Sequence, residues 1–178
     1  VFGEQPYAEY RGDRSDLVFE FTDGENTALV KDLKSKGIPV VSIFLTGRPL
    51  WVNPLLNASD AFVVAWLPGT EGGGVADVLV GKSDGNPRHD FKGKLSFTWP
   101  DDGSGRLIND DDKDGVLFPY GYGLTYEAPG SFDILSEKSG VSNVAASFDG
   151  KVVTRGDAAN PFMLYLGDSS NLNTPMTA

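Results

Sequence analysis

Two almost uninterrupted apolar runs constrain the fold of this 178-residue chain. Residues 38–45 form the first run and residues 61–66 the second. Such apolar runs are typical of strands that are buried on both faces, and such strands are characteristic of a parallel sheet. Apolar residues at helical spacing precede the first run in residues 26–36 and follow the second in residues 71–80. Strands that alternate with helices predict an α/β fold, here a three-layer sandwich with a mostly parallel sheet.

Weaker signals complete this predicted domain. Gly37 follows the first helix as its C-terminal cap. Residues 17–21 predict a short extended segment, and residues 50–56 predict one or two helical turns. Residues 94–99 alternate between apolar and polar side chains, which predicts a half-buried strand. Catalytic groups in such folds usually lie on loops at the carboxyl ends of the strands, so we expect the functional residues there.

The sequence pattern changes after residue 127. Beyond it no helical spacing is evident, and turns such as Asp149-Gly150 separate strand-like segments at residues 132–135, 144–148, 151–154 and 162–166. We therefore predict two domains: an α/β-sandwich domain in residues 1–127, and a linker with the start of a β-rich accessory module in residues 128–178. Val1 to Gly3 resembles a strand end and residues 171–178 a linker, so we expect neighbouring segments on both sides.

Composition excludes several classes of function. The formal net charge is −10 and no cluster of Lys and Arg is present, so a polyanion such as nucleic acid would be repelled. No apolar run reaches the ~20 residues that cross a bilayer, so no membrane partner is expected. The chain has no cysteine and a single histidine, His89, which leaves no disulfide and no histidine pair for a metal. A neutral substrate such as a carbohydrate fits this composition, and no cofactor is expected.

Six segments in the first 126 residues match an ordered set of landmarks. The first is Gly3-Glu4-Gln5-Pro6-Tyr7-Ala8-Glu9 followed by Gly12-Asp13. The others are residues 46–50, 53–56, 66–79, 93–100 and 118–126. Together they resemble glycoside hydrolase family 3, and six landmarks in the right order are far more specific than any single one.

This resemblance implies part of a retaining β-glucosidase or exo-β-1,3/1,4-glucanase that hydrolyses terminal non-reducing β-D-glucosyl residues. In the family, the active site lies between a TIM-like barrel, which supplies an aspartate nucleophile, and a second domain of this kind. The resemblance therefore implies that an N-terminal barrel domain of the same polypeptide is a partner, that a β-glucan or β-glucoside is the substrate, and that the location is periplasmic or secreted. The chain alone is expected to be inactive, because it lacks the nucleophile.

The resemblance points to Glu9 as the general acid/base. Hydrolysis with retention needs two carboxyl groups about 5–5.5 Å apart, one of which protonates the departing oxygen. Glu9 lies several residues beyond the strand end, so its loop could reach towards another domain, where a facing carboxylate would raise its pKa. Glu4 is the alternative acid, although its position at the strand end favours an anchoring role. A solvated loop glutamate is the non-catalytic interpretation of Glu9.

Arg48 follows the first apolar run and could orient the acid or pair with Glu4, and we favour a structural ion pair. Tyr7, Arg11 and Asp13 are candidates for hydrogen bonds within the same loop.

The three tryptophans have a structural and a functional interpretation. Sugar rings stack on indoles, so Trp51 is a candidate for substrate binding, but we interpret it as a core residue. Trp66 and Trp99 are also interpreted as core.

Two loops suggest ligands. Residues 69–74 precede a helix in the manner of a phosphate cradle, but the P-loop pattern fails because Ala76 stands where a glycine is required before Gly81-Lys82-Ser83. Asp110, Asp112 and Asp114 open a calcium-loop pattern that lacks the closing glutamate, since Gly121 occupies that position. We interpret the second loop as a solvated acidic loop, with calcium as the alternative.

Two other functions compete with the enzyme hypothesis. The strands after Ser131 could belong to a non-catalytic carbohydrate-binding or interaction module. A flavodoxin-like regulatory or nucleotide domain is a more distant interpretation, and both the absent phosphate loop and the acidic charge count against it.

Overall fold

The computed structural model describes residues 1–8, 10, 12–20, 22–141, 153–154 and 157–158. The chain divides into two compact units, Val1–Val141 and Ser142–Ala178. In the second unit the described residues form one antiparallel pair, β6 (Val153–Thr154) and β7 (Asp157–Ala158).

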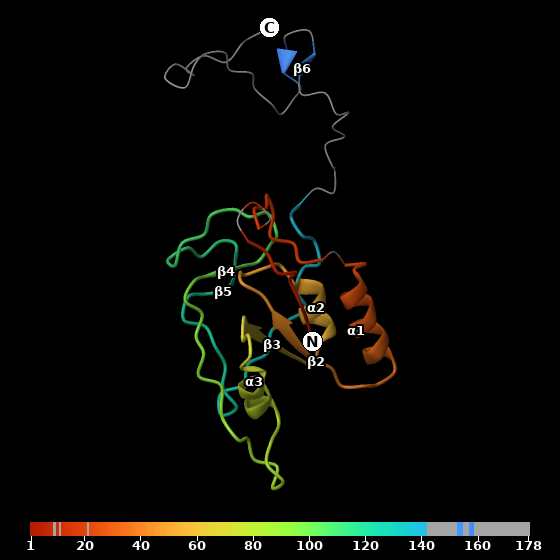
Figure 1. The fold of residues 1–178 in the computed structure, drawn as a ribbon, viewed down its shortest axis with the longest axis vertical. Coiled ribbons are helices and arrows are strands. Elements are labelled where there is room, and N and C mark those ends of the chain that lie inside the picture. The colour runs from red at the N-terminus through yellow and green to blue at the C-terminus, as the bar shows by residue number, and fades with distance from the viewer. Residues whose placement is uncertain (9, 11, 21, 142–152, 155–156, 159–178) are drawn as a thin grey trace. The chain divides into compact units, whose positions relative to one another are not determined.

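A three-stranded parallel sheet forms the centre of the first unit (Figure 1). Strand β2 (Val41–Leu45) lies between β1 (Phe2–Gly3) and β3 (Ala61–Trp66). Phe2 faces Phe44 in the first pair, and Val41 faces Ala61 in the second. Both longer strands fall within the two apolar runs, so the predicted α/β fold with a parallel sheet is confirmed.

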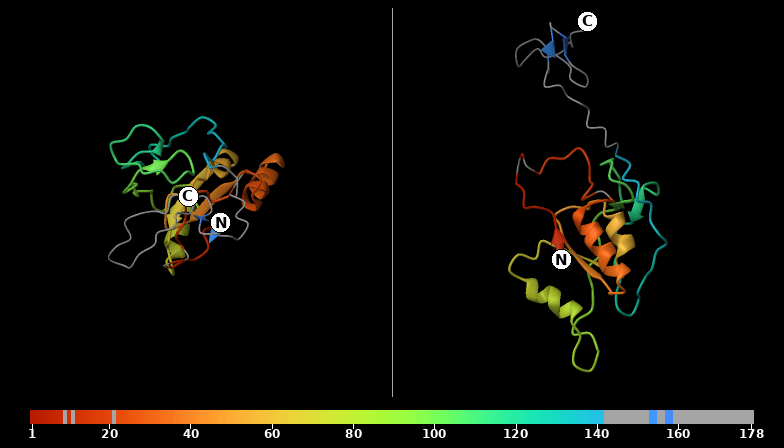
Figure 2. Two further views of the ribbon diagram at one scale, coloured as in Figure 1. Left: turned by 90° about the horizontal axis from the view of Figure 1, so that it is seen from above. Right: turned by 90° about the vertical axis from the view of Figure 1, so that its right-hand side faces the viewer.

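Helices connect the strands as the sequence predicts. Helix α1 (Glu25–Ser35) precedes β2, α2 (Asn53–Ala58) joins β2 to β3, and α3 (Gly72–Leu79) follows β3. Helices α1 and α2 pack side by side on the sheet, whereas α3 lies away from them (Figure 2). Gly37 ends the first helical segment with a φ of 74°, a left-handed conformation that glycine adopts without strain.

The core lies between the sheet and the helices α1 and α2. Phe44 on the central strand is fully buried and meets the ring of Phe19 edge-on, with centroids 4.9 Å apart. Trp51 and Trp99 are 0% and 2% exposed, so both are core residues as predicted. Trp66 is half-buried and packs against Trp99, with ring centroids 6.0 Å apart.

The N-terminus of α1 is capped from outside the helix. Gly24 holds the capping position and has no side chain to offer. The carboxylate of Glu20 takes over this function, because its Oε1 accepts hydrogen bonds from the backbone N–H and the hydroxyl of Thr27 at 2.5 and 2.7 Å. Its Oε2 accepts from the backbone N–H and side-chain amide of Asn26 at 3.3 and 3.0 Å. Free N–H groups and the helix dipole both favour an anion at this place.

We expect Glu20→Ala to lower the free energy of unfolding by about 1–2 kcal/mol, the usual cost of losing an N-terminal cap. Urea-induced unfolding followed by circular dichroism measures this loss. Glu25→Ala is the matched control, because it removes the same charge from the first turn of the same helix and Glu25 is exposed. Equal losses in the two variants would contradict the capping role.

Two strand predictions are wrong in position. Of residues 94–99 only Trp99 is in a strand, β4 (Trp99–Pro100), which pairs antiparallel with β5 (Val116–Phe118). Residues 132–135 form no strand, because the backbone of Leu135 bonds instead to the side-chain amide of Asn57, with both hydrogen bonds 2.9 Å long.

The remaining C-terminal predictions are only partly covered by the structure. Residues 144–148 and 162–166 lie outside the described residues, and only the last two residues of 151–154 are described, as β6. Residues 128–141, which follow the predicted boundary at 127, belong to the first unit, where Glu137 forms an ion pair with Lys31 at 3.2 Å. No helix in the described part of the chain is long and apolar enough to cross a membrane.

Candidate active site

The carboxyl ends of the three parallel strands meet at one edge of the sheet. Glu4 follows β1 directly and is tied to β2, because its N–H donates to the carbonyl of Leu45 at 2.9 Å. Thr46 follows β2, and its N–H donates to the carbonyl of Trp66 at 3.2 Å. The residues that follow each strand are thereby brought together, as expected for a parallel sheet.

Close backbone packing at this edge depends on Gly3. A Cβ atom at Gly3 would lie 2.3 Å from the carbonyl oxygen of Leu45. Real Cβ atoms essentially never approach an oxygen so closely, so a larger residue would push the end of β1 away from β2. Gly3 therefore fixes the point from which Glu4 and the following loop leave the sheet.

Trp66 has an unusual backbone conformation at the same edge. Its φ is 54°, and the register between β2 and β3 shifts so that Leu45 faces Trp66. Bulky residues rarely adopt a positive φ, and such strain is stabilised only by surrounding contacts. The ring of Trp66 is held edge-on against Phe97, with centroids 5.5 Å apart.

Glu4 and Arg48 form the predicted ion pair. Arg48 Nε lies 2.9 Å from Glu4 Oε1, and the two side chains are 19% and 11% exposed, Arg48 first. The hydroxyl of the fully buried Thr46 donates to Glu4 Oε2 at 3.0 Å. Both carboxylate oxygens of Glu4 are therefore engaged in contacts that link β1 to the loop after β2.

Arg48 also holds the loop that follows β1. Its guanidinium carbon lies 4.0 Å from the ring centroid of Tyr7, a cation–π contact. Its Nη1 donates to the carbonyl of Gly12 at 2.6 Å. The N–H of Gly12 in turn donates to the carbonyl of Ala8 at 3.0 Å. Tyr7, Ala8 and Gly12, which lie on either side of Glu9 in the sequence, are thus tied to Arg48 or to each other.

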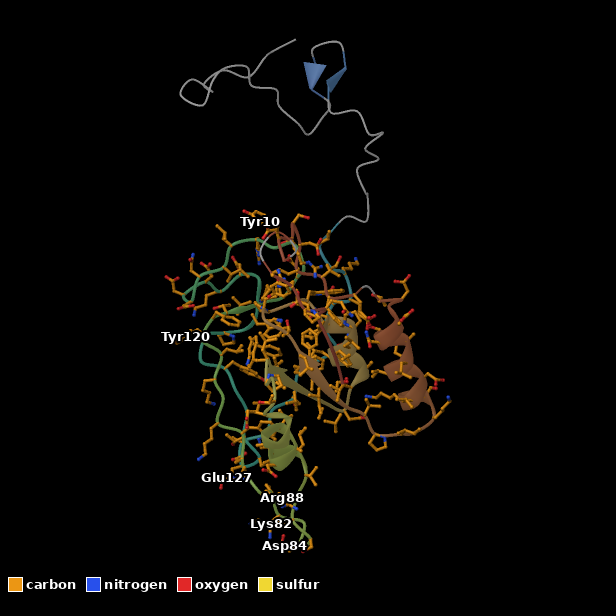
Figure 3. All side chains as sticks on the ribbon, viewed as in Figure 1. Tyr10, Lys82, Asp84, Arg88, Tyr120 and Glu127 are labelled. Carbon is orange, nitrogen blue, oxygen red and sulfur yellow. The ribbon has the colours of Figure 1, made fainter. Side chains whose placement is uncertain are left out.

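Glu9 and Arg11 themselves lie outside the described residues. Tyr10 is 85% exposed with a φ of 67°, and it lies at the tip of the loop (Figure 3). Asp13 is exposed. Of the residues predicted to form contacts within this loop, the structure thus brings Glu4, Tyr7 and Arg48 together.

Sequence reasoning missed two residues that shape this region. Arg14 holds the end of the loop, because its Nη2 donates to Asp16 Oδ1 at 3.0 Å and to the carbonyl of Val18 at 2.5 Å. Glu20 holds the start of α1. Together with Glu4, Tyr7 and Arg48 they line a pocket of about 440 Å³ at the base of the loop. The only sequence signal for either residue was the spacing of Arg14 and Asp16, which are two residues apart and of opposite charge, and could have indicated their ion pair.

The lysine of the incomplete P-loop pattern is distant from the loop that contains Tyr10, and the described acidic loop brings no metal-ligand group together. Lys82 lies at the opposite end of the first unit from Tyr10 (Figure 3). In the acidic loop, Asp112 Oδ2 accepts hydrogen bonds from Asn109 at 2.7 and 3.4 Å. Among the described residues, no three acidic or histidine side chains come close enough to hold a metal ion.

Comparisons with known proteins agree with the geometry. The family model "Glycosyl hydrolase family 3 C-terminal domain" matches residues 1–126. A periplasmic beta-glucosidase of Salmonella typhimurium is 32% identical over 74% of this chain and 19% of its own length. A xylan 1,4-beta-xylosidase of Xylanibacter ruminicola is 36% identical over 78% of this chain and 15% of its own.

A solved structure is more similar in sequence. The exo-1,3/1,4-beta-glucanase of a Pseudoalteromonas species is 54% identical and superposes with a TM-score of 0.73, over 79% of this chain and 18% of its own. The chain spans at most about a fifth of each of these three proteins. On the family match and these relatives, the chain belongs to glycoside hydrolase family 3, as its C-terminal α/β domain.

Proposed function

We propose that this chain contributes the general acid/base to a retaining β-glucosidase or exo-β-1,3/1,4-glucanase, and that Glu9 is that residue. The supporting observation is the fixation of the flanking residues, since Arg48 binds both Tyr7 and Gly12 at the carboxyl edge of the sheet. General acids work only when they are held in place relative to the bond they cleave.

Glu9 would act twice in the reaction. In the first step its carboxyl group protonates the glycosidic oxygen while a carboxylate from another domain attacks the sugar. In the second step the carboxylate of Glu9 takes a proton from the water that releases the sugar. Glu4 is less suited to this role, because both of its oxygens are already engaged by Arg48 and Thr46.

The partner in this proposal is an N-terminal barrel domain of the same polypeptide, which supplies the nucleophile. The small share of each relative that this chain covers is consistent with such a further domain. The substrate is a β-glucan or β-glucoside with a terminal β-D-glucosyl residue, as the names of the glucosidase and glucanase relatives suggest. We propose a periplasmic or secreted location, because the Salmonella relative is named a periplasmic beta-glucosidase.

The division of labour between domains has a direct test. We expect the isolated chain to release no detectable nitrophenol from an aryl β-glucoside, because one of the two required carboxyl groups is missing. The full-length enzyme, assayed at the same molar concentration, is the positive control. Turnover by the isolated chain, purified from a host that lacks a β-glucosidase of its own, would contradict the proposal.

A further inference from the structure

The contacts of Arg48 fix the position of its side chain and place the opposite charge of Glu4 beside its guanidinium. Its guanidinium stacks on Tyr7, donates to the carbonyl of Gly12 and pairs with Glu4. These contacts join the two ends of the segment that contains Glu9 to the ends of β1 and β2. We call Glu4, Tyr7 and Arg48 the loop clamp.

The charges that line the same pocket are each matched by a partner. Arg14 forms an ion pair with Asp16 at 3.0 Å. The carboxylate of Glu20 faces the positive end of α1. Arg48 is matched by Glu4, and both side chains are largely withdrawn from water. Without Glu4, the charge of Arg48 would be uncompensated in a region of weak solvent screening.

The neutralisation of Arg48 by Glu4 matters for a nearby general acid. A nearby unpaired cation favours the ionised form of a carboxyl group, whereas a general acid must keep its proton near neutral pH. We propose that Arg48 is a positioning residue for the acid/base and that Glu4 neutralises Arg48, so that the loop clamp holds the loop without promoting ionisation of the acid. This inference rests on the proposed function of Glu9.

The test compares Glu4→Gln, Arg48→Gln and the double variant in the full-length enzyme, with kcat/KM for an aryl β-glucoside measured across pH. We expect Glu4→Gln to move the alkaline limb to lower pH, because Arg48 is then unpaired. Arg48→Gln should move it to higher pH, because Glu4 is then unpaired. Shifts of about 0.5 pH unit or more are expected for one uncompensated charge in this setting.

The double variant separates charge from position. It restores neutrality, so its alkaline limb should return to the wild-type pH, while kcat stays about 10- to 100-fold low because the loop is no longer held. Arg48→Lys keeps the charge but loses the planar stack and fork, so it should lower kcat with the limb unchanged. Lys34→Gln combined with Asp60→Asn is the control, since it removes an exposed ion pair elsewhere.

The outcomes also distinguish this inference from the proposed function. The inference would be overturned if the alkaline limb of kcat/KM lay at the same pH in all variants. It would also be overturned if Glu4→Gln and Arg48→Gln moved this limb in the same direction. Thermal unfolding of each variant identifies those that fail to fold, and Glu4→Gln is nearly isosteric, so it keeps the test decisive. If Glu9→Gln alone retains the wild-type rate, the proposed function fails, whatever the limbs of the other variants do.

Discussion

Replacing Glu9 by glutamine in the full-length enzyme is expected to lower kcat/KM for oligosaccharides by about 10²- to 10⁴-fold, the usual contribution of general acid–base catalysis. Glutamine keeps the size of the side chain but cannot protonate the leaving oxygen. The loss should be smaller for a dinitrophenyl β-glucoside, because its leaving group needs little protonation. Steady-state kinetics on the two substrates measure this difference.

Azide provides the control for this prediction. A small anion can attack the glycosyl-enzyme intermediate without help from a general base, so azide should partly restore turnover of the activated substrate and produce a β-glucosyl azide. Glu4→Gln is the matched variant, since Glu4 begins the same loop, and azide should not accelerate it. Wild-type rates in Glu9→Gln, or azide rescue of Glu4→Gln alone, would move the acid/base role to Glu4.

The central fold was predictable because burial leaves a strong mark on sequence. Strands β2 and β3 fall within the two apolar runs, and Gly37 marked the end of the helical segment of α1. Strands that depend on distant partners were less predictable. The alternation in residues 94–99 is present in the sequence, but only Trp99–Pro100 finds a partner strand. Residues 132–135 have a strand-like sequence, yet the backbone of Leu135 bonds to Asn57, a side chain far away along the chain.

The candidate site was predictable in part for a similar reason. Glu4 and Arg48 each follow a strand of a parallel sheet, so the topology itself predicts that they meet, and they do. The stacking of Arg48 on Tyr7 and its bond to Gly12 depend on the path of an irregular loop. No periodicity encodes that path. Glu20 was missed as a cap because the capping position itself holds Gly24 and the carboxylate comes from a residue that precedes this position in the chain.

Trp99→Ala is expected to lower the free energy of unfolding by about 3–5 kcal/mol, the usual cost of truncating a buried aromatic residue. Trp99 is 2% exposed within the main hydrophobic core. Its Nε1 also donates to the carbonyl of Leu50 at 3.1 Å. The substitution therefore removes packing and leaves a buried carbonyl without that donor. Urea-induced unfolding, followed by circular dichroism, measures the loss.

Two phenylalanine variants separate the hydrogen bond from the packing. Trp99→Phe removes the donor to Leu50, which should add about 1–3 kcal/mol for an unsatisfied buried acceptor. Trp51→Phe removes a similar volume from a residue that is 0% exposed. The Nε1 of Trp51 has no acceptor among the described residues, so its removal relieves a buried unpaired donor. Trp99→Phe should therefore be the more destabilising of the two. A larger loss in Trp51→Phe would mean that indole packing, and not the bond to Leu50, decides the stability of this part of the core.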